Sequence, residues 1–254
     1  MAYKLEVRHL SKQFDGKRVL DDISFQVNAG EFLSVLGESG CGKTTLLRIL
    51  IGLERADCGE ILKDGQEISH EPPSVRGMGI VFQNYALFPN MTVLENVSYA
   101  LKNHPDLKAR ARRIALDTLE MIGMADQLDK KPAQLSGGQQ QRVAIARTLA
   151  MRPSIVLLDE PISALDVGNK EIMKHELKEI QRKSHTTMIY VTHDQEEAFF
   201  LSDRIMVLRQ GRIEQLDTPK AIFGTPKTAY IRSFVVQHLN NKLESLQCST
   251  GIRP

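Results

Sequence analysis

The segment GESGCGKT, residues 37–44, constrains this chain more than any other. It overlaps the end of the apolar stretch EFLSVLG, residues 31–37, and leads into the apolar-periodic stretch KTTLLRILIGL, residues 43–53. It fits the pattern G-x-x-x-x-G-K-[ST], in which loop N–H groups close around phosphate oxygens. In this pattern Lys43 reaches the β- and γ-phosphates and the Thr44 hydroxyl can ligate Mg²⁺. The order strand, glycine-rich loop and helix predicts the start of an α/β fold.

Strand and helix patterns alternate along most of the chain. The expected strands lie at residues 3–10, 19–27, 31–37, 78–83, 154–159, 186–193, 204–209 and 212–216, with a hairpin at residues 59–68 that turns at Asp64–Gly65. Residues 84–152 carry almost no strand signal, and their helical periodicity lies at residues 92–102, 106–124 and 139–151. The simplest interpretation is a parallel-sheet core with an all-helical insertion.

Composition limits the classes of protein to which the chain can belong. Apolar residues make up 42% and charged residues 25% of its 254 residues, which is typical of a folded protein. A net charge of +2 favours neither nucleic acid nor a membrane surface as a partner. Cys41, Cys58 and Cys248 are too far apart for a disulfide framework or metal site, which indicates a reducing compartment. The sequence contains neither a signal peptide nor an apolar stretch near the roughly 20 residues that span a bilayer, so any membrane partner must supply the spans.

Polar residues also follow three other predicted strands. Asp159 and Glu160 end the strand SIVLLDEP, where the first suits a Mg²⁺ shell and the second a position beside an attacking water. His193 ends IYVTHD and Gln83 ends GIVFQ. In a parallel sheet these ends lie near the phosphate loop, which favours a phosphate contact for His193. Simpler roles stay open: a helix-capping Glu160, a structural His193 and a polar loop position for Gln83.

The stretch LSGGQQQR, residues 135–142, contains no group for acid–base chemistry at neutral pH. Ser136, Gly137 and Gly138 stand at the start of a predicted helix, where backbone amides attract anions. The glycines allow a phosphate to approach the backbone closely. The stretch is therefore a second anion-binding end, with an ordinary capped helix as the alternative.

Taken together, these motifs resemble those of the nucleotide-binding subunit of an ATP-binding cassette (ABC) transporter, over roughly residues 3–236. GESGCGKTT is similar to the Walker A loop, SIVLLDE to Walker B, VFQ to the Q-loop, SALD to the D-loop, VTHD to the switch histidine and LSGGQQQR to the family signature. The resemblance implies an ABC-type P-loop NTPase with a RecA-like parallel-sheet core, an N-terminal antiparallel β subdomain and an inserted helical subdomain near residues 84–152. The ATPase domain would cover residues 1–240.

The resemblance also implies ATP and Mg²⁺ as cofactors and assigns roles to the site residues. Those that bind ATP would be Phe14, Gly37, Glu38, Ser39, Gly40, Cys41, Gly42, Lys43, Thr44 and Thr45. Glu160 would be the general base and His193 would hold the γ-phosphate, with Gln83 and Lys43 completing the catalytic set. Thr44, Gln83 and Asp159 would hold Mg²⁺. The signature residues Ser136, Gly137, Gly138 and Gln139 would bind ATP on a second subunit, with Asp166 at the interface.

Two positions, one aromatic and one a thiol, have competing interpretations. Phe14 would stack on adenine, but a buried core phenylalanine is the alternative. Cys41 lies beside a helix N-terminus and Lys43, which both favour a thiolate. The interpretation that we favour for Cys41 is nevertheless a small residue that merely fits the loop.

The implied partners are a second copy of the chain, with ATP between the two, and integral membrane permease subunits. A coupling helix of the permease would dock near residues 83–89, although ordinary packing explains the apolar YALFP segment, residues 85–89, equally well. An extracytoplasmic solute-binding protein would belong to the same system, and no nucleic acid is expected. The chain would lie in the cytoplasm, on the inner face of the membrane.

Within the family, several segments look most like importers of sugars, polyamines, ferric iron or oxyanions. Many such subunits continue into a β-rich regulatory domain of about a hundred residues. The polar tail at residues 241–254 cannot form that domain, so we expect none. An exporter ATPase, a DNA-maintenance ATPase and a translation-type switch are the alternatives. Roughly ninety residues without sustained heptads separate Thr44 from Ser136, which disfavours the DNA class. The single motif set disfavours the translation class.

Overall fold

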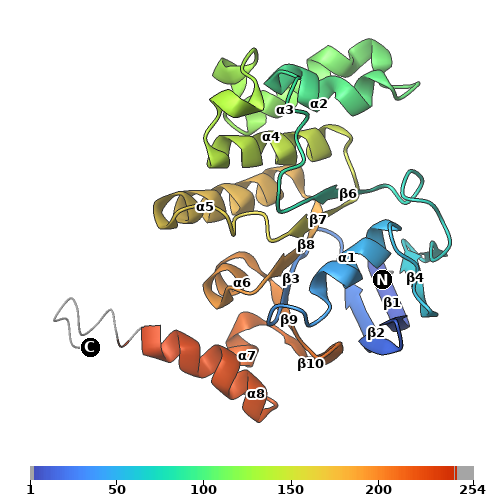
Figure 1. Ribbon diagram of the computed structural model, residues 1–254, viewed down its shortest axis with the longest axis vertical. Coiled ribbons are helices and arrows are strands. Elements are labelled where there is room, and N and C mark those ends of the chain that lie inside the picture. Colours follow the sequence, from blue (N-terminus) through green and yellow to red (C-terminus); the bar gives the residue numbers. More distant parts are fainter. Residues whose placement is uncertain (1–2, 243, 245–254) are drawn as a thin grey trace.

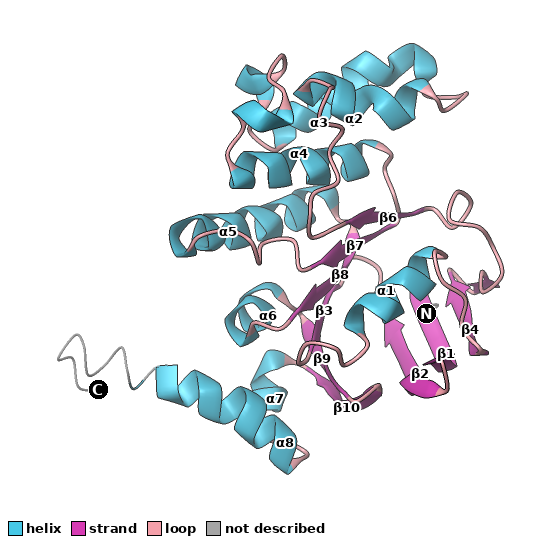
Figure 2. Ribbon diagram, viewed as in Figure 1, coloured by secondary structure: helices cyan, strands magenta, loops and turns pink. Residues whose placement is uncertain are grey.

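Two β-sheets and a separate layer of helices make up the molecule (Figures 1 and 2). The computed structural model describes residues 3–242 and 244. The smaller sheet is antiparallel, with strand order β2-β1-β4-β5, and contains β1 (Leu5–Phe14), β2 (Lys17–Val27), β4 (Cys58–Lys63) and β5 (Gln66–Glu67). Its β4–β5 hairpin turns at Asp64 and Gly65, both with positive φ, as the sequence predicts.

The larger sheet has the strand order β10-β9-β3-β8-β7-β6. Its strands are β3 (Phe32–Leu36), β6 (Met78–Val81), β7 (Ile155–Asp159), β8 (Thr187–Thr192), β9 (Arg204–Arg209) and β10 (Arg212–Asp217). All neighbours pair in parallel except β10, which runs antiparallel to β9. Every residue of β3 and β8 is buried, because helices and the smaller sheet cover both faces. The predicted parallel-sheet core and antiparallel N-terminal subdomain are both confirmed.

The helices divide between the core and the separate layer. Those of the core and the C-terminal segment are α1 (Lys43–Ile51), α5 (Val167–Ser184), α6 (Gln195–Leu201), α7 (Pro219–Gly224), α8 (Ala229–Ile231) and the π-helical turn η4 (Arg232–Gln237). The separate layer contains α2 (Val93–Lys102), α3 (Ala111–Met121) and α4 (Gly137–Ala150), with short 3-10 turns η1 (Lys108–Arg110), η2 (Ala125–Gln127) and η3 (Pro132–Gln134). Residues 84–152 are all described and contain no strand, as predicted.

The layer made by α2, α3 and α4, which we call the helical layer, has an apolar interior that is continuous with one face of the larger sheet. Val97, Leu101, Leu119 and Val143 are fully buried within it. The helix expected at residues 106–124 is shorter than predicted: a 3-10 turn precedes α3, and the helix ends at Met121. Among the helices of residues 3–242, none is long and apolar enough to cross a membrane.

The predicted C-terminal tail lies mostly outside the described residues. Residues 241, 242 and 244 are helical, and residues 243 and 245–254 are not described. The boundary at residue 240 therefore stays a prediction.

The carboxyl ends of β3, β7 and β8 lie at the same edge of the larger sheet, because these neighbouring strands run parallel. The chain leaves β3 at Gly37, β7 at Glu160 and β8 at His193. Side chains from three distant parts of the sequence thus meet at one edge, which is where open α/β sheets place their ligands.

Arg76 is a buried arginine that the sequence analysis does not identify. Its guanidinium, 2% exposed, donates hydrogen bonds to the carbonyls of Ile49 and Leu50, both at 2.8 Å, at the C-terminal end of α1. It also donates to the carbonyls of Glu71, at 2.8 Å, and Ser69, at 2.9 Å. It therefore supplies the donor for the Leu50 carbonyl, adds to the Gly52 amide that bonds the Ile49 carbonyl at 3.1 Å, and ties that helix to the loop after β5.

We expect Arg76→Ala to lower the free energy of unfolding by about 3 kcal/mol, because buried carbonyls lose their donor. Urea unfolding followed by circular dichroism measures the change. Arg55→Ala, at an exposed position, is the control and is expected to change stability by less than about 0.5 kcal/mol. Equal stability of the two variants would contradict this role for Arg76.

Candidate functional site

The glycine-rich loop curls around the ammonium group of Lys43. This side chain is 4% exposed, and its Nζ donates to the carbonyl oxygens of Gly37 at 2.8 Å and Glu38 at 2.9 Å. The loop thus holds a positive charge at its own centre before any ligand binds. Glu38, Ser39 and Gly40 at the tip of the loop are exposed, so their backbone amides are accessible to an anion.

Two of the loop glycines are required by packing against neighbouring strands. A Cβ on Gly37 would lie 2.3 Å from the carbonyl oxygen of Leu208 in β9. Gly42 has φ 109°, and its Cβ would lie 2.7 Å from the carbonyl oxygen of Val19 in β2. The sequence analysis explains the glycines by phosphate contact alone, whereas these two also allow both sheets to approach the loop.

The structure gives Cys41 an environment that disfavours a thiolate. The side chain is 8% exposed and belongs to an apolar cluster with Leu33 and Leu46. Burial raises the pKa of the Cys41 thiol, and this effect exceeds the opposing effect of Lys43. The residue instead fixes the back of the loop, because its carbonyl oxygen accepts a hydrogen bond from the Gly211 amide at 3.1 Å. This burial agrees with the favoured interpretation, a small residue that fits the loop.

Asp159 and Thr44 form an oxygen-rich position beside the loop. The Thr44 hydroxyl donates to Asp159 Oδ1 at 3.1 Å, and burial raises the pKa of Asp159. Carboxylate and hydroxyl oxygens are ligands that Mg²⁺ prefers, so the donor set fits this ion. Among the described residues, no group of three or more His, Cys, Asp and Glu side chains is arranged to hold a metal. A Mg²⁺ ion here would therefore share its shell with water and phosphate oxygens.

Glu160 and His193 are in direct contact at the same edge. His193 Nδ1 lies 3.0 Å from Glu160 Oε2, and Lys43 Nζ lies 4.0 Å from Glu160 Oε1. The backbone of Glu160 has φ 45°, which is uncommon for a residue with a side chain, and its amide donates to the Val191 carbonyl at 3.0 Å. The carboxylate is thus held between a histidine and a lysine that come from different elements.

Gln83 lies two residues beyond β6, which ends at Val81, so the expectation that it ends the strand is wrong. Its amide nitrogen donates to Ser163 Oγ at 3.2 Å, and the Ser163 hydroxyl donates to the Glu160 carbonyl oxygen at 2.9 Å. Ser163 therefore links Gln83 to Glu160. Ser163 is the first residue of the SALD motif, to which the sequence alone assigns no such contact. Metal binding by Gln83 stays a prediction.

The signature residues lie apart from the site just described. Ser136 caps α4: its hydroxyl accepts from the Gln139 amide at 3.3 Å, and Gln139 Oε1 accepts from the Ser136 amide at 2.9 Å. This helix lies in the helical layer, separated from α1 by α5 and β7 (Figure 1). A Cβ on Gly138 would meet no atom within 4 Å, so the start of the helix is open.

The remaining predicted residues lie at the surface. Phe14 ends β1 and is 41% exposed, so the alternative of a buried core phenylalanine is wrong. The Lys12 ammonium lies 4.8 Å from the centroid of its ring. Asp166 caps α5, and hydrogen bonds from Asn169 lower the pKa of its carboxyl. Thr45 lies in the first turn of α1 and is partly buried.

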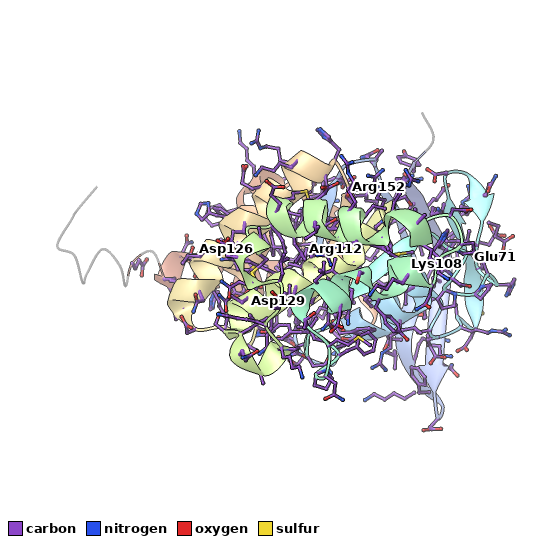
Figure 3. The ribbon with its side chains drawn as sticks, turned by 90° about the horizontal axis from the view of Figure 1, so that it is seen from above. Glu71, Lys108, Arg112, Asp126, Asp129 and Arg152 are labelled. Carbon is purple, nitrogen blue, oxygen red and sulfur yellow. The ribbon has the colours of Figure 1, made fainter. Side chains whose placement is uncertain are left out.

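A groove of about 610 Å³ lies where β6 meets the helical layer and is lined by residues of both. Ala86, Phe88, Tyr99, His104, Arg147 and Arg152 are among its lining residues. The sequence leaves two interpretations of the YALFP segment open, ordinary packing and a contact with the permease. Tyr85 and Leu87 pack against the apolar interior. Ala86 and Phe88 line the groove instead. Figure 3 shows Arg152 on the same upper side of the molecule as Lys108 and Arg112 of the helical layer.

Phe88 and Tyr99 form an aromatic pair in this groove, with ring centroids 4.7 Å apart. Phe88 is 37% exposed and Tyr99 is 43% exposed. Arg147 donates to the carbonyls of Ala86 at 2.7 Å and Tyr85 at 3.2 Å, which fixes the loop that carries Phe88. Exposed aromatic side chains beside a fixed loop are typical of a protein interface.

Comparison with known proteins identifies the family to which the chain is similar. The model of the ABC transporter family matches residues 20–163. The spermidine/putrescine import ATP-binding protein PotA of Marinobacter nauticus is 49% identical over 231 residues, which cover 91% of this chain and 62% of that protein. The protein of the same name from Lawsonia intracellularis is 46% identical over 245 residues, covering 96% of this chain and 67% of that protein. The chain thus spans less than two thirds of the Marinobacter protein.

A solved structure is similar over nearly the whole chain. The cbiO1 protein of Clostridium perfringens, part of the ABC transporter complex cbiONQ, matches with a TM-score of 0.83 and 29% identity. The match covers 96% of this chain and 100% of that one. The predicted fold, an α/β P-loop NTPase of the ABC type, is confirmed.

Proposed function

The chain belongs to the ABC transporter family, and on this premise we propose that it hydrolyses ATP to drive the import of a solute through separate membrane subunits. The ATPase domain covers residues 1–240. The observation that carries the proposal is the contact between Glu160 and His193 at 3.0 Å, beside the lysine at the centre of the phosphate loop. A carboxylate held in this way is placed to accept a proton from water.

Each residue at the sheet edge has a role in this proposal. Lys43 and the loop amides bind the phosphates of ATP, and Phe14 offers an open ring face to adenine. Thr44 and Asp159, with Gln83, hold Mg²⁺, which neutralises phosphate charge when bound. Glu160 accepts the proton of the attacking water. His193 fixes the carboxylate and contacts the γ-phosphate.

The signature supports a site shared between two copies of the chain. Gly137 and Gly138 present helix-start amides beside the exposed Ser136, with open space around Gly138, and Lys43 already fills the loop from its own side. In a homodimer, the signature of one copy binds the γ-phosphate held by the other, and Asp166 lies at the interface. ATP thus joins the two copies, and hydrolysis separates them.

The groove beside Phe88 and Tyr99 is the proposed contact with the permease, because it joins the helical layer to the strand that leads to Gln83. Movement of a permease helix in this groove would reach Glu160 through Gln83 and Ser163. The relatives are named for spermidine and putrescine import, so we propose a polyamine as the solute. An extracytoplasmic binding protein delivers it, and the ATPase lies on the cytoplasmic face of the membrane.

Ser136→Arg tests the shared site. We expect ATP affinity to stay within about twofold, and hydrolysis to fall about a hundredfold or more, because the arginine fills the space of the partner's phosphate. ATP titration measures the affinity, steady-state assays measure hydrolysis, and light scattering with ATP measures whether the dimer forms. Ser136→Thr is the matched control, because threonine also caps a helix, and it is expected to dimerise.

If the rate of hydrolysis per molecule of the purified wild type rises with protein concentration, this would support the dimer. Full activity of Ser136→Arg would indicate that the signature is only the start of an ordinary capped helix. A wild type that neither binds nor hydrolyses Mg²⁺-ATP would overturn the proposed function itself.

A further inference from the structure

Glu197 is a buried carboxylate that none of the sequence motifs explains. It lies in α6 and is 3% exposed. Its Oε2 accepts hydrogen bonds from two hydroxyl groups, those of Tyr190 at 2.7 Å and Thr192 at 2.6 Å. Burial raises the pKa of Glu197, and these hydrogen bonds oppose that effect. A carboxylate is costly to bury, so a protein that retains one has a use for its contacts.

The two hydroxyl donors flank the segment of β8 that supports the site. Tyr190 and Thr192 point to one face of the sheet, because side chains alternate along a strand. Between them, the carbonyl of Val191 accepts the hydrogen bond from the Glu160 amide at 3.0 Å. His193 follows Thr192 directly. One carboxylate oxygen therefore holds both ends of the segment that fixes Glu160 and His193.

The turn after His193 is fixed by the same group. The Thr192 hydroxyl donates to Glu197 and accepts from the Asp194 amide at 3.0 Å. Asp194 Oδ1 in turn accepts from the amides of Glu196 at 2.8 Å and Glu197 at 3.2 Å, at the start of α6. The backbone on both sides of His193 is thus connected to Glu197 by hydrogen bonds.

The other oxygen of Glu197 faces α5. Lys170 Nζ lies 3.9 Å from Glu197 Oε1, and Lys170 is one turn from Asp166, which caps α5. The carboxylate thus lies between the strand that ends in His193 and the helix whose cap is proposed to face the second subunit.

We propose that Glu197 is a positioning residue for ATP hydrolysis, acting through His193 and the backbone of Glu160. This inference rests on the proposed function. Glu197 makes its contacts below the sheet edge and not with the phosphate loop, so its removal changes the rate of the reaction and not the affinity for ATP. A shift of about 1 Å between reacting groups lowers a rate by about a hundredfold.

The test compares kcat, the KM for ATP and the equilibrium affinity for ATP in the full chain with Mg²⁺-ATP. Glu197→Ala is expected to lower kcat by about 10- to 100-fold, with KM and affinity within about twofold. Glu197→Gln keeps an oxygen that accepts both hydroxyl hydrogen bonds, and it is expected to recover most of kcat. Tyr190→Phe removes one donor without changing shape, and a loss of about threefold to tenfold is expected even if Glu197→Ala does not fold.

Ser202→Ala is the matched control, because it removes a different buried hydrogen bond, to Ser34, at the other end of α6. It is expected to leave kcat unchanged. The ring-nitrogen NMR signals of His193, assigned with His193→Gln, give a second readout. They are expected to shift in Glu197→Ala and in Tyr190→Phe, but not in Ser202→Ala.

Unchanged kcat and unchanged His193 signals in Glu197→Ala and Tyr190→Phe would overturn the inference. So would a parallel loss of ATP affinity and kcat, which indicates general damage to the site. If the wild type hydrolyses no ATP, the proposed function fails, while the His193 signals still show whether Glu197 positions this histidine.

Discussion

Glu160→Gln is expected to bind ATP at least as tightly as the wild type and to hydrolyse it about a thousandfold more slowly. Glutamine has the same shape and keeps an atom within reach of His193, which lies 3.0 Å from the carboxylate. It accepts no proton at neutral pH, so the attacking water loses its base. Removal of a negative charge beside the phosphates also favours the ATP-bound dimer.

Single-turnover hydrolysis, ATP titration and light scattering measure the three effects of Glu160→Gln. The control is Glu60→Gln, which removes an exposed carboxylate on β4 and is expected to behave as wild type. A Glu160→Gln variant that turns over normally and stays monomeric with ATP would be incompatible with both the general base and the shared site.

Lys43→Ala is expected to lower ATP affinity by about a hundredfold or more, equivalent to about 3 kcal/mol. The change removes the positive charge from the centre of the loop. It also removes the donor to the Gly37 carbonyl and one of two donors to the Glu38 carbonyl, which keeps the Cys41 amide at 3.3 Å, so the loop is held less firmly before nucleotide arrives. Both effects act on binding, in contrast to Glu160→Gln.

Calorimetric titration with Mg²⁺-ATP measures the affinity, and the thermal shift that ATP induces gives an independent readout. Lys130→Ala removes an exposed lysine of the helical layer and serves as the control. Unchanged ATP binding by Lys43→Ala would rule out the loop as the phosphate site.

The sequence predicts the strands and the phosphate loop well, because both depend on neighbours along the chain. The strands β3, β7 and β8 are largely apolar and buried; β3 leads into the phosphate loop at Gly37, and β7 and β8 are followed directly by Glu160 and His193. A parallel sheet then brings Lys43, Glu160 and His193 to one edge without further information. The boundary of α3 is less well predicted, because α3 is preceded by a 3-10 turn that periodicity alone does not distinguish.

Burial is what the sequence leaves undetermined. The charge beside Cys41 favours a thiolate, but desolvation by the surrounding core has the larger effect and the pKa rises. Arg76 looks like a surface residue in PPSVRG, yet it is buried against the end of α1. Phe14 is the opposite case, an aromatic side chain that remains exposed.

The sequence by itself determined the fold class, the order of the motifs and the identity of the charged groups at the sheet edge, because these follow from local patterns and strand direction. Only the tertiary structure decided that Ser163 joins Gln83 to Glu160, and that Glu197 holds the strand beneath His193. Such hydrogen bonds join residues from separate elements within about 3 Å, and no periodicity along the chain specifies that distance.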